Sequence, residues 1–397
     1  MKDQILGEAQ RMQTELISHR RWLHAHPETG FELQHTRDYV RQQLTDMGYS
    51  PKNCGRCGII ADIGRGEKNM LLRADMDALP IREETGLHFA GTNGNMHACG
   101  HDLHTAMLLG AAKLLKAHEA QLKGRVRLLF QAAEEVFEGA EDMIANGALE
   151  GVDAAMMIHV TVGAPLPTGT AIISSPGISA PAADYFTIEV RGRGCHGSTP
   201  NEGVDTITAA AHILIALQEI QARELGINDK AVLTIGTIQG GSAPNAIAGS
   251  VSMAGTLRTL NEHLRTKLKH RMTDIARGIA AAFRAEAEVV FGSGCPCLQN
   301  DAAISAGVTD ALKELLGSEW AYTTKELNPD GGPSAGGSED FAYVSQQVPA
   351  VMVALAAGNP SKGYTYPLHH PKVRFDEEAL PVGAAIHAYC ALKFLSE

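Results

Sequence analysis

The sequence predicts an α/β protein in which a mixed sheet flanked by helices is interrupted by an inserted, smaller domain. The chain has 397 residues, more than a single hydrophobic core usually holds. Strand patterns alternate with helical patterns before about residue 183 and again after 295. The segment between them has the order β-α-β-β-α-β, the split βαβ of ferredoxin-like domains. We therefore expect one domain built from 1–183 and 295–397, with 184–294 inserted into it.

In the first part of the chain, helices are expected where apolar residues recur at helical spacing, and strands where short apolar runs occur. The stretch 103–118 is apolar on most faces, which indicates a buried helix. The expected helices run from the N-terminus to Leu23 and over 34–47, 103–118 and 138–146, and the expected strands are 58–63, 70–74, 126–131 and 154–159.

The rest of the chain supplies the inserted domain and the return to the first one. Asn261 is a good N-cap for a helix that reaches about Phe283. The inserted domain has expected strands at 185–191, 231–238, 250–258 and 286–291 and a further helix at 205–225. After it we expect a helix at 302–316, a Gly-rich loop at 330–337, a strand at 350–355 and a helix at 377–395.

Composition narrows the possible partners and the location. The net charge is −11, aromatic residues make up 5% of the chain, and no basic run stands out, so neither nucleic acid nor a membrane surface is an expected partner. The N-terminus lacks the apolar core of a signal peptide. The seven Cys, including a Cys54-Gly-Arg-Cys57 turn, are expected to be reduced thiols of a cytoplasmic protein.

The densest group of chemically active side chains lies at 96–104, which reads Met-His-Ala-Cys-Gly-His-Asp-Leu-His. Three His, one Cys and one Asp fall in the turn before the buried helix. Catalytic groups of α/β folds gather at such ends of strands and helices. Helix capping plus a chance cluster of His is the alternative, and the other segments argue against it.

Acids and imidazoles also stand at or beyond the ends of other apolar segments. They are Asp75 and Asp77, Glu134 and Glu135, His159, and His369 with His370. Because the carboxyl ends of parallel strands meet at one edge of a sheet, we expect these side chains to converge. A single His or a Glu pair would usually be a solvated surface feature, so the joint pattern carries the prediction.

Cys, His and Glu together suit zinc or a similar divalent transition metal, whereas an all-carboxylate site would suit Mg or Ca better. A Cys with several His could also be a thiol nucleophile. Two adjacent carboxylates and several separated imidazoles exceed what one Cys–His pair needs. The Glu134-Glu135 pair fits a division of roles, in which one Glu binds metal and the other stays free as a general base.

These motifs together carry a resemblance to a known family. The string around Cys99, the Glu134-Glu135 pair, Ser338-Glu339-Asp340-Phe341 and the inserted domain resemble the dinuclear metallopeptidase family of aminoacylases and bacterial carboxypeptidase G. The chain is most similar to the branch of amidohydrolases that act on hippurate, auxin–amino acid conjugates and related N-acyl amino acids. That branch has Cys-Gly-His-Asp-x-His where other branches place a bridging Asp. The resemblance extends from Leu23 to Glu377.

The resemblance implies two divalent metal ions per subunit, Zn, Mn, Ni or Co. The implied ligands are Cys99, His101, Glu135, His159 and His369. Cys99 would bridge the ions, and Glu134 would be the general base. Arg73 stands where other branches have a metal-binding His, so His101 would replace that ligand, and Asp75 would orient a ligand.

The inserted domain also resembles its counterpart in the family. Its segment 194–200, Gly-Cys-His-Gly-Ser-Thr-Pro, is similar to one whose His reaches a neighbouring subunit's site. The resemblance implies that His196 stabilises the oxyanion and that Asn245 and Arg258 bind the substrate carboxylate. It also implies a homodimer or higher homo-oligomer in which the inserted domain serves as lid and dimerisation domain.

We therefore expect a metal-dependent amidohydrolase that cleaves a small-molecule N-acyl amino acid into a free amino acid and a carboxylic acid. A dipeptidase or carboxypeptidase of the same family is an alternative, because a dipeptide is itself an N-acyl amino acid. A Cys99 thiol hydrolase without metal is a second alternative. A binding protein that kept the fold and lost catalysis is a third, against which Glu134 and the intact ligand set argue.

Overall fold

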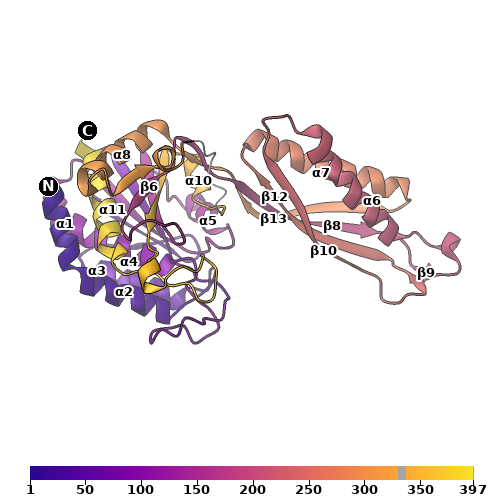
Figure 1. Cartoon of the computed structure of the whole chain (residues 1–397), viewed down its shortest axis with the longest axis horizontal. Helices are drawn as coiled ribbons and strands as arrows, with labels where there is room; N and C mark the ends of the chain where they lie inside the picture. Colours follow the sequence, from indigo (N-terminus) through magenta and orange to yellow (C-terminus); the bar gives the residue numbers. More distant parts are fainter. Residues whose placement is uncertain (330–336, 397) are drawn as a thin grey trace. The chain divides into compact units, whose positions relative to one another are not determined.

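A computed structural model describes residues 1–329 and 337–396, and the chain divides into two compact units (Figure 1). Unit 1 contains Met1–Ser179 and most of the described chain from Gln299 onward, and unit 2 is built on Ala180–Leu298 together with Gly337 and Ser338. The chain thus leaves unit 1 and later returns to it. Elements from both ends of the sequence therefore complete one sheet.

The centre of unit 1 is a mixed sheet. Its strands in the described part of the chain are, in order across the sheet, β1 (Lys52–Cys54), β2 (Gly58–Gly64), β4 (Arg125–Gln131), β3 (Asn69–Asp75), β5 (Ala154–Thr161), β16 (Ala350–Ala356), β6 (Ala171–Ile173) and β15 (Ala321–Thr323). The neighbours β4, β3, β5 and β16 are all parallel, whereas β2 and β6 pair antiparallel with β4 and β16. The carboxyl ends of the four parallel strands therefore lie at one edge, as predicted.

Helices flank this sheet (Figure 1). They are α1 (Lys2–Arg11), α2 (Gln13–Ala25), α3 (Gln34–Asp46), α4 (His101–Ala117), α5 (Gly139–Ala145), α8 (Ala302–Leu316), α9 (Thr324–Leu327), α10 (Ala342–Ser345) and α11 (Ala379–Ser396). Helices α4 and α11 pack on each other and on β3 and β5. Nearly every side chain of α4 is buried, which confirms the prediction drawn from its apolar residues on most faces.

Unit 2 has the predicted βαββαβ order. Its main elements are β8 (Ala182–Arg191), α6 (Thr206–Glu219), β10 (Ala231–Gly240), β12 (Ser250–Thr259), α7 (Glu262–Ala282) and β13 (Glu286–Cys295). The four strands form an antiparallel sheet in the order β10-β12-β8-β13, and α6 and α7 pack together on it (Figure 1). Asn261 caps α7 by accepting a hydrogen bond from the Leu264 amide, as expected. Short ladders complete the description, with β9 (Cys195–His196) paired to β11 (Ala246–Ile247) and β7 (Gly177–Ala180) to β14 (Leu298–Asn300).

The structure differs from the sequence prediction in two places. The single N-terminal helix is two helices, α1 and α2, which meet at Met12. Helix α1 packs mainly on α11, and α2 packs mainly on α4. The two helices have a similar apolar periodicity in the sequence, so the pattern alone did not show the break between them. The strands that were not predicted are two to four residues long, too short to show a period. Of the predicted Gly-rich loop at 330–337, residues 330–336 lie outside the described part of the chain.

Helix α11 is long and apolar enough to resemble a membrane span by length and composition alone. However, 78% of that stretch is buried inside the protein. The helix lies between α1, α4 and α8, which is the environment of a core helix.

None of the seven cysteines, all of which lie in the described part of the chain, forms a disulfide bond. In the Cys54-Gly-Arg-Cys57 turn, the Cys54 thiol lies 3.4 Å from the Met143 carbonyl oxygen and donates to it. Burial raises the pKa of Cys54 to about 11 and also raises the pKa of Cys57. The turn is therefore a structural corner of β1 and β2, without the lowered thiol pKa of a redox pair.

One buried imidazole couples the stability of unit 1 to pH. His387 of α11 is 1% exposed, and its Nδ1 has no hydrogen-bond partner. Burial lowers the pKa of His387 to about 3, so the folded protein keeps this ring neutral. The unfolded chain takes up a proton below about pH 6.5. The contribution of neutral His387 to the free energy of unfolding is therefore fully present above about pH 6.5 and is lost progressively as the pH falls towards 3. At pH 5 the free energy of unfolding is lower by about 2 kcal/mol for this reason.

We predict that His387→Leu removes this part of the acid sensitivity. Between pH 7 and pH 5 the thermal unfolding midpoint of the variant should fall less than that of the wild type. The exposed His35 provides the control, since His35→Leu should follow the wild type. Parallel midpoint curves for His387→Leu and the wild type would show that His387 does not carry the effect.

Candidate metal centre

The turn that precedes α4 places Cys99 and His101 at the carboxyl edge of the sheet. Gly100 between them has φ 89°, and a Cβ there would lie 2.4 Å from Cγ2 of Val160. Only glycine combines this left-handed conformation with so close a contact. Cys99 is 7% exposed and His101 is fully buried. His101 Nδ1 donates to the Asp77 carbonyl oxygen at 2.8 Å, which leaves Nε2 directed elsewhere.

A sharp turn after β4 brings Glu134 and Glu135 to one side of the sheet. Ala133 adopts φ 58°, so the chain does not continue the strand alternation that would point the two glutamates apart. The Asp77 carboxylate accepts a hydrogen bond from the Glu134 amide and another from the Glu135 amide, both at 3.1 Å. One carboxylate therefore fixes the backbone of the whole pair.

The end of β5 holds His159 with help from His104. His159 Nδ1 donates to the Val160 carbonyl oxygen at 2.8 Å, and Nε2 lies 3.6 Å from Cys99 Sγ. His104 Nδ1 bonds Asp75 at 2.6 Å, and its Nε2 accepts from the Val160 amide at 2.8 Å. Burial lowers the pKa of His159 and of His104 to about 4, so both rings are neutral near pH 7. Asp75 thus acts on the strand end through His104.

His369 and His370 point to different environments. The His369 amide donates to the Ala98 carbonyl oxygen at 2.9 Å, and its Nε2 lies 3.6 Å from Glu135 Oε1. His370 instead stacks on the Tyr366 ring, with ring centroids 4.4 Å apart. Only the first of the two imidazoles therefore faces the carboxylate pair.

The donors predicted in unit 1 come together in overlapping groups. In each group the donor atoms all lie within 4.8 Å of one another. The groups are Cys99 with His101 and His159, Cys99 with Glu135 and His369, and His101 with Glu134 and Glu135. Cys99 is common to the first two groups, and Glu134 stands beside them.

The residues present fit divalent cations at this point. His101 Nε2 and Glu135 Oε1 are buried and have no hydrogen-bond partner, which is costly unless another group binds them. Fully buried Arg73 forms ion pairs with Asp75 at 2.6 Å and with Glu339 and Asp340 at 2.9 Å. Glu134 and Glu135 form no ion pair with Arg73; in the described part of the chain their ion-pair partners are the His101 and His369 rings, at 3.6 to 3.9 Å. The set of thiol, imidazole and carboxylate donors suits zinc and similar ions.

The pKa shifts point the same way. Burial raises the pKa of Glu134 well above its usual range, and the Glu339 and Glu135 carboxylates add to the shift. Burial also raises the pKa of Glu135 to about 7 and that of the Cys99 thiol to about 12. A nucleophilic cysteine needs a lowered thiol pKa, so the arrangement disfavours a thiol hydrolase. A divalent cation would supply the missing positive charge and favour the ionised donors.

Sequence reasoning placed Asp77 among the converging acids and Asp340 in the family motif but gave neither residue a specific contact, and both support the site. Asp340 accepts from Gln131 and from the Ala140 amide, and its own amide lies 3.4 Å from Glu134 Oε1. Arg73, expected only as a replacement for a metal-binding His, is the cation that holds this acidic cluster. The available signals were the position of Asp77 just beyond β3 and the Ser-Glu-Asp-Phe motif.

The three predicted residues of unit 2 are not grouped together within that unit. His196 pairs with Ala246 across β9 and β11, and the Gly197 amide donates to the Asn245 carbonyl oxygen at 2.8 Å. Along β12, Ser250 pairs with Arg191 and Arg258 pairs with Ala183. Arg258 therefore lies about 27 Å along the strand from Ser250, given about 3.4 Å per residue. Unit 2 thus brings His196 and Asn245 together and holds Arg258 at the other end of β12.

Comparison with known proteins identifies the family. The model of Peptidase family M20/M25/M40 matches residues 71–393. An N-acetyl-L-cysteine deacetylase of Bacillus subtilis strain 168 is 38% identical over 374 residues, which cover 93% of this chain and 85% of that protein. The IAA-amino acid hydrolase ILR1-like 2 of Arabidopsis thaliana is 36% identical over 389 residues, which cover 96% of this chain and 85% of that protein.

A solved structure agrees with these sequence matches. The Bacillus subtilis YXEP protein, described as a dinuclear metal binding peptidase of the M20 family, has 34% identity to this chain and a TM-score of 0.80. The match covers 98% of this chain and 99% of that one. The resemblance drawn from the cysteine–histidine string and the Glu pair is thereby confirmed. The chain belongs to peptidase family M20/M25/M40 and is a metal-dependent hydrolase of amide bonds.

Proposed function

We propose that this enzyme hydrolyses small N-acyl amino acids and releases a free amino acid and a carboxylic acid. The observation that carries the proposal is the pair of donor groups that share Cys99, with Glu134 beside them. The relatives named for N-acetyl-L-cysteine and for IAA–amino acids support the substrate class, because both names describe an acyl group on an amino acid.

In this proposal the metal ligands are divided between the two donor groups. Cys99, His101 and His159 form one, and Cys99, Glu135 and His369 form the other, so Cys99 belongs to both. Two divalent ions held there, Zn, Mn, Ni or Co, would supply positive charge that polarises the scissile carbonyl and makes water more acidic.

Glu134 is the proposed general base. It is 4% exposed, its amide is held by Asp77, and its Oε1 faces the Asp340 amide. A carboxylate in this position removes a proton from the attacking water and passes it to the nitrogen of the leaving amine. The contacts with Asp77 and the Asp340 amide favour one orientation of the Glu134 side chain for both proton transfers.

Unit 2, predicted as the inserted domain at 184–294, is the proposed lid and dimerisation domain. We propose that His196 stabilises the oxyanion at a neighbouring subunit's metal centre and that Asn245 and Arg258 bind the substrate carboxylate. Because Arg258 lies at the other end of β12, Asn245 would act together with His196 from one subunit and Arg258 from the other. Strand β10 lies at one edge of its sheet and exposes Val232 by 56% and Ile238 by 50%. An exposed apolar edge strand is a surface suited to pairing with a second copy, which supports a homodimer or larger oligomer.

The proposal includes a cytoplasmic location and a small molecule as the only partner besides further copies of the chain. The lack of a disulfide bond at any of the seven cysteines, all in the described residues, supports a reducing compartment. The net charge of −11 supports neither nucleic acid nor an anionic membrane surface as a partner.

Peptidase activity is the second candidate. The YXEP protein is described as a peptidase, and the acyl group of a dipeptide is an aminoacyl group. The same general base and donor groups would serve either substrate. The two candidates therefore differ only in what the enzyme prefers to bind.

We predict that Glu134→Gln retains both metal ions but loses turnover. Because the amide cannot accept the proton, kcat should fall by a factor of about 10² to 10⁴. Metal content is measured by elemental analysis alongside hydrolysis of an N-acetyl amino acid. Glu138→Gln, which alters an exposed carboxylate paired with Arg56, is the matched control and should remain active. Near-normal kcat in Glu134→Gln would remove Glu134 from the mechanism.

A chelator should abolish activity, and added Zn, Mn, Ni or Co should restore it, because the donors are arranged for divalent ions. Each reconstituted enzyme is then assayed on a panel of N-acyl amino acids and dipeptides. We expect higher kcat/KM for the N-acyl amino acids. Activity that is indifferent to the chelator would favour the Cys99 thiol mechanism, and a preference for dipeptides would favour the peptidase.

His196→Ala should also impair turnover, since the oxyanion would lose a donor. Mixing His196→Ala with Glu134→Gln in equal amounts should restore about a quarter of wild-type activity if His196 acts across a two-fold dimer. Mixing Glu134→Gln with Glu135→Gln is the control, because both changes lie in one unit and no intact site can form. Absence of recovery in the first mixture would place His196 within its own subunit.

A further inference from the structure

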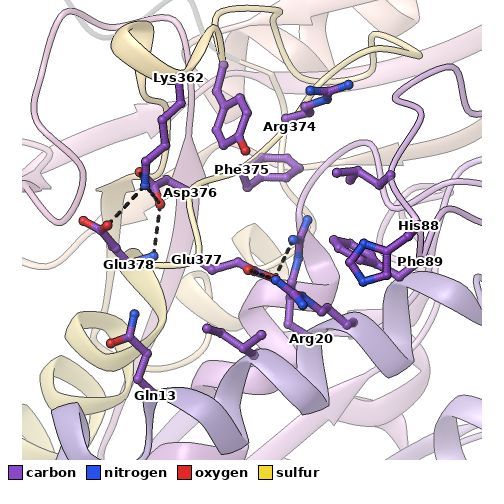
Figure 2. A pocket seen from close by; sticks show the side chains of 14 residues that line it. Gln13, Arg20, His88, Phe89, Lys362, Arg374, Phe375, Asp376, Glu377 and Glu378 are labelled. Atoms are coloured by element: carbon purple, nitrogen blue, oxygen red, sulfur yellow. Dashed lines mark hydrogen bonds and ion pairs between the residues drawn. The ribbon is translucent and has the colours of Figure 1, made fainter.

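Unit 1 contains a second cavity, separate from the metal centre. It has a volume of about 300 Å³ and lies between α2, the segment 87–89 and the segment 362–378 (Figure 2). None of the five proposed metal ligands lines it. A volume of this size accommodates a small molecule.

Most of the charged side chains around the cavity form ion pairs. Four are cationic and three are carboxylates, namely Arg20, Arg21, Lys362 and Arg374 against Asp376, Glu377 and Glu378. Arg20 and Arg21 both form ion pairs with Glu377. Lys362 forms ion pairs with Asp376 and Glu378 (Figure 2). Arg374 donates to the Thr85 carbonyl oxygen and forms no ion pair with any carboxylate in the described part of the chain. One guanidinium charge in the wall is therefore uncompensated.

A second guanidinium in the wall has unused donors. Arg20 is 2% exposed, its Nε lies 2.8 Å from Asp102, and its Nη1 lies 3.0 Å from Glu377. Its Nη2 is buried and has no hydrogen-bond partner. Asp102 and Glu377 thus hold the Arg20 guanidinium in the wall, and its remaining nitrogen is enclosed by the protein.

The cavity also has a non-polar wall. The guanidinium carbons of Arg20 and Arg21 each lie 5.0 Å from the centre of the Phe89 ring, which keeps that ring beside both cations. Ile17 and Leu87 line the same space. A ligand with a short hydrocarbon portion would find apolar contact next to the cationic groups.

We propose that this cavity binds a small oxyanion, a carboxylate or a phosphate, through Arg374. The planar guanidinium presents N–H groups at the spacing of two oxygen atoms of such an anion. The three carboxylates are already paired with cations, so a positively charged ligand would find no free partner. The site does not depend on which amide the enzyme cleaves.

The test measures anion binding to the metal-loaded enzyme by isothermal titration calorimetry. Inorganic phosphate and butyrate are titrated separately, with potassium chloride at matched ionic strength as the blank. We expect saturable binding of at least one anion to the wild type. Binding of phosphate alone would identify a phosphoryl ligand, and binding of butyrate would identify a carboxylate.

Variants at position 374 assign the binding to the cavity. Arg374→Gln keeps a donor for the Thr85 carbonyl oxygen but removes the charge, so it should weaken binding at least tenfold while metal content and the thermal midpoint without anion stay unchanged. Arg374→Lys should bind with intermediate affinity. Lys372→Gln, an exposed cation two residues away, should bind like the wild type. Equal affinity in Arg374→Gln and the wild type, or no saturable binding of either anion, would overturn the proposal.

Discussion

The metal centre depends on the burial of many carboxylates around a single guanidinium. Arg73 is fully buried in β3 and pairs with Asp75, Glu339 and Asp340, which come from both ends of the chain. A buried charge is tolerated only when it is paired and hydrogen-bonded. Arg73 therefore ties the returning carboxy-terminal segment to the centre of the sheet. The carboxylates that it does not reach, Glu134 and Glu135, remain for metal ions and for proton transfer.

Hydrogen bonds with Asp75 and Asp77 fix the positions of the metal-binding side chains. Asp75 holds His104, which in turn accepts from the Val160 amide and so sets the end of β5 beside His159. Asp77 holds the Glu134 and Glu135 amides and accepts from His101 through its carbonyl oxygen. Glu134, Glu135 and His159 thus follow or end strands, whereas Cys99 and His369 lie in connecting segments that a backbone hydrogen bond from the His369 amide to Ala98 joins. Hydrogen bonds from neighbouring groups of this kind keep the ligands of a metal ion in a fixed orientation.

The same helix that carries His101 also connects the metal centre with the second cavity. Asp102, the next residue of α4, accepts from Arg20 and bonds His24. Arg20 lies in the cavity wall, so one guanidinium contacts both the helix that leads from the metal centre and the proposed anion site. The metal centre and the cavity thus share one buried polar network within unit 1.

The α/β class and the βαββαβ insertion were predictable from the sequence because periodicity is a local property. The family and the grouping of residues 99, 101, 134, 135, 159 and 369 were predictable because the motifs that resemble the family lie within short stretches of the chain. The sequence did not reveal the break between α1 and α2, whose cause is packing on different helices. Only the tertiary structure decided that Arg73 pairs with Asp340 and that Asp77 fixes the Glu134 amide. It also showed that Arg374 has no carboxylate partner among the described residues. These facts are distances between residues far apart in the chain, and a linear pattern carries no information on which charges meet after burial.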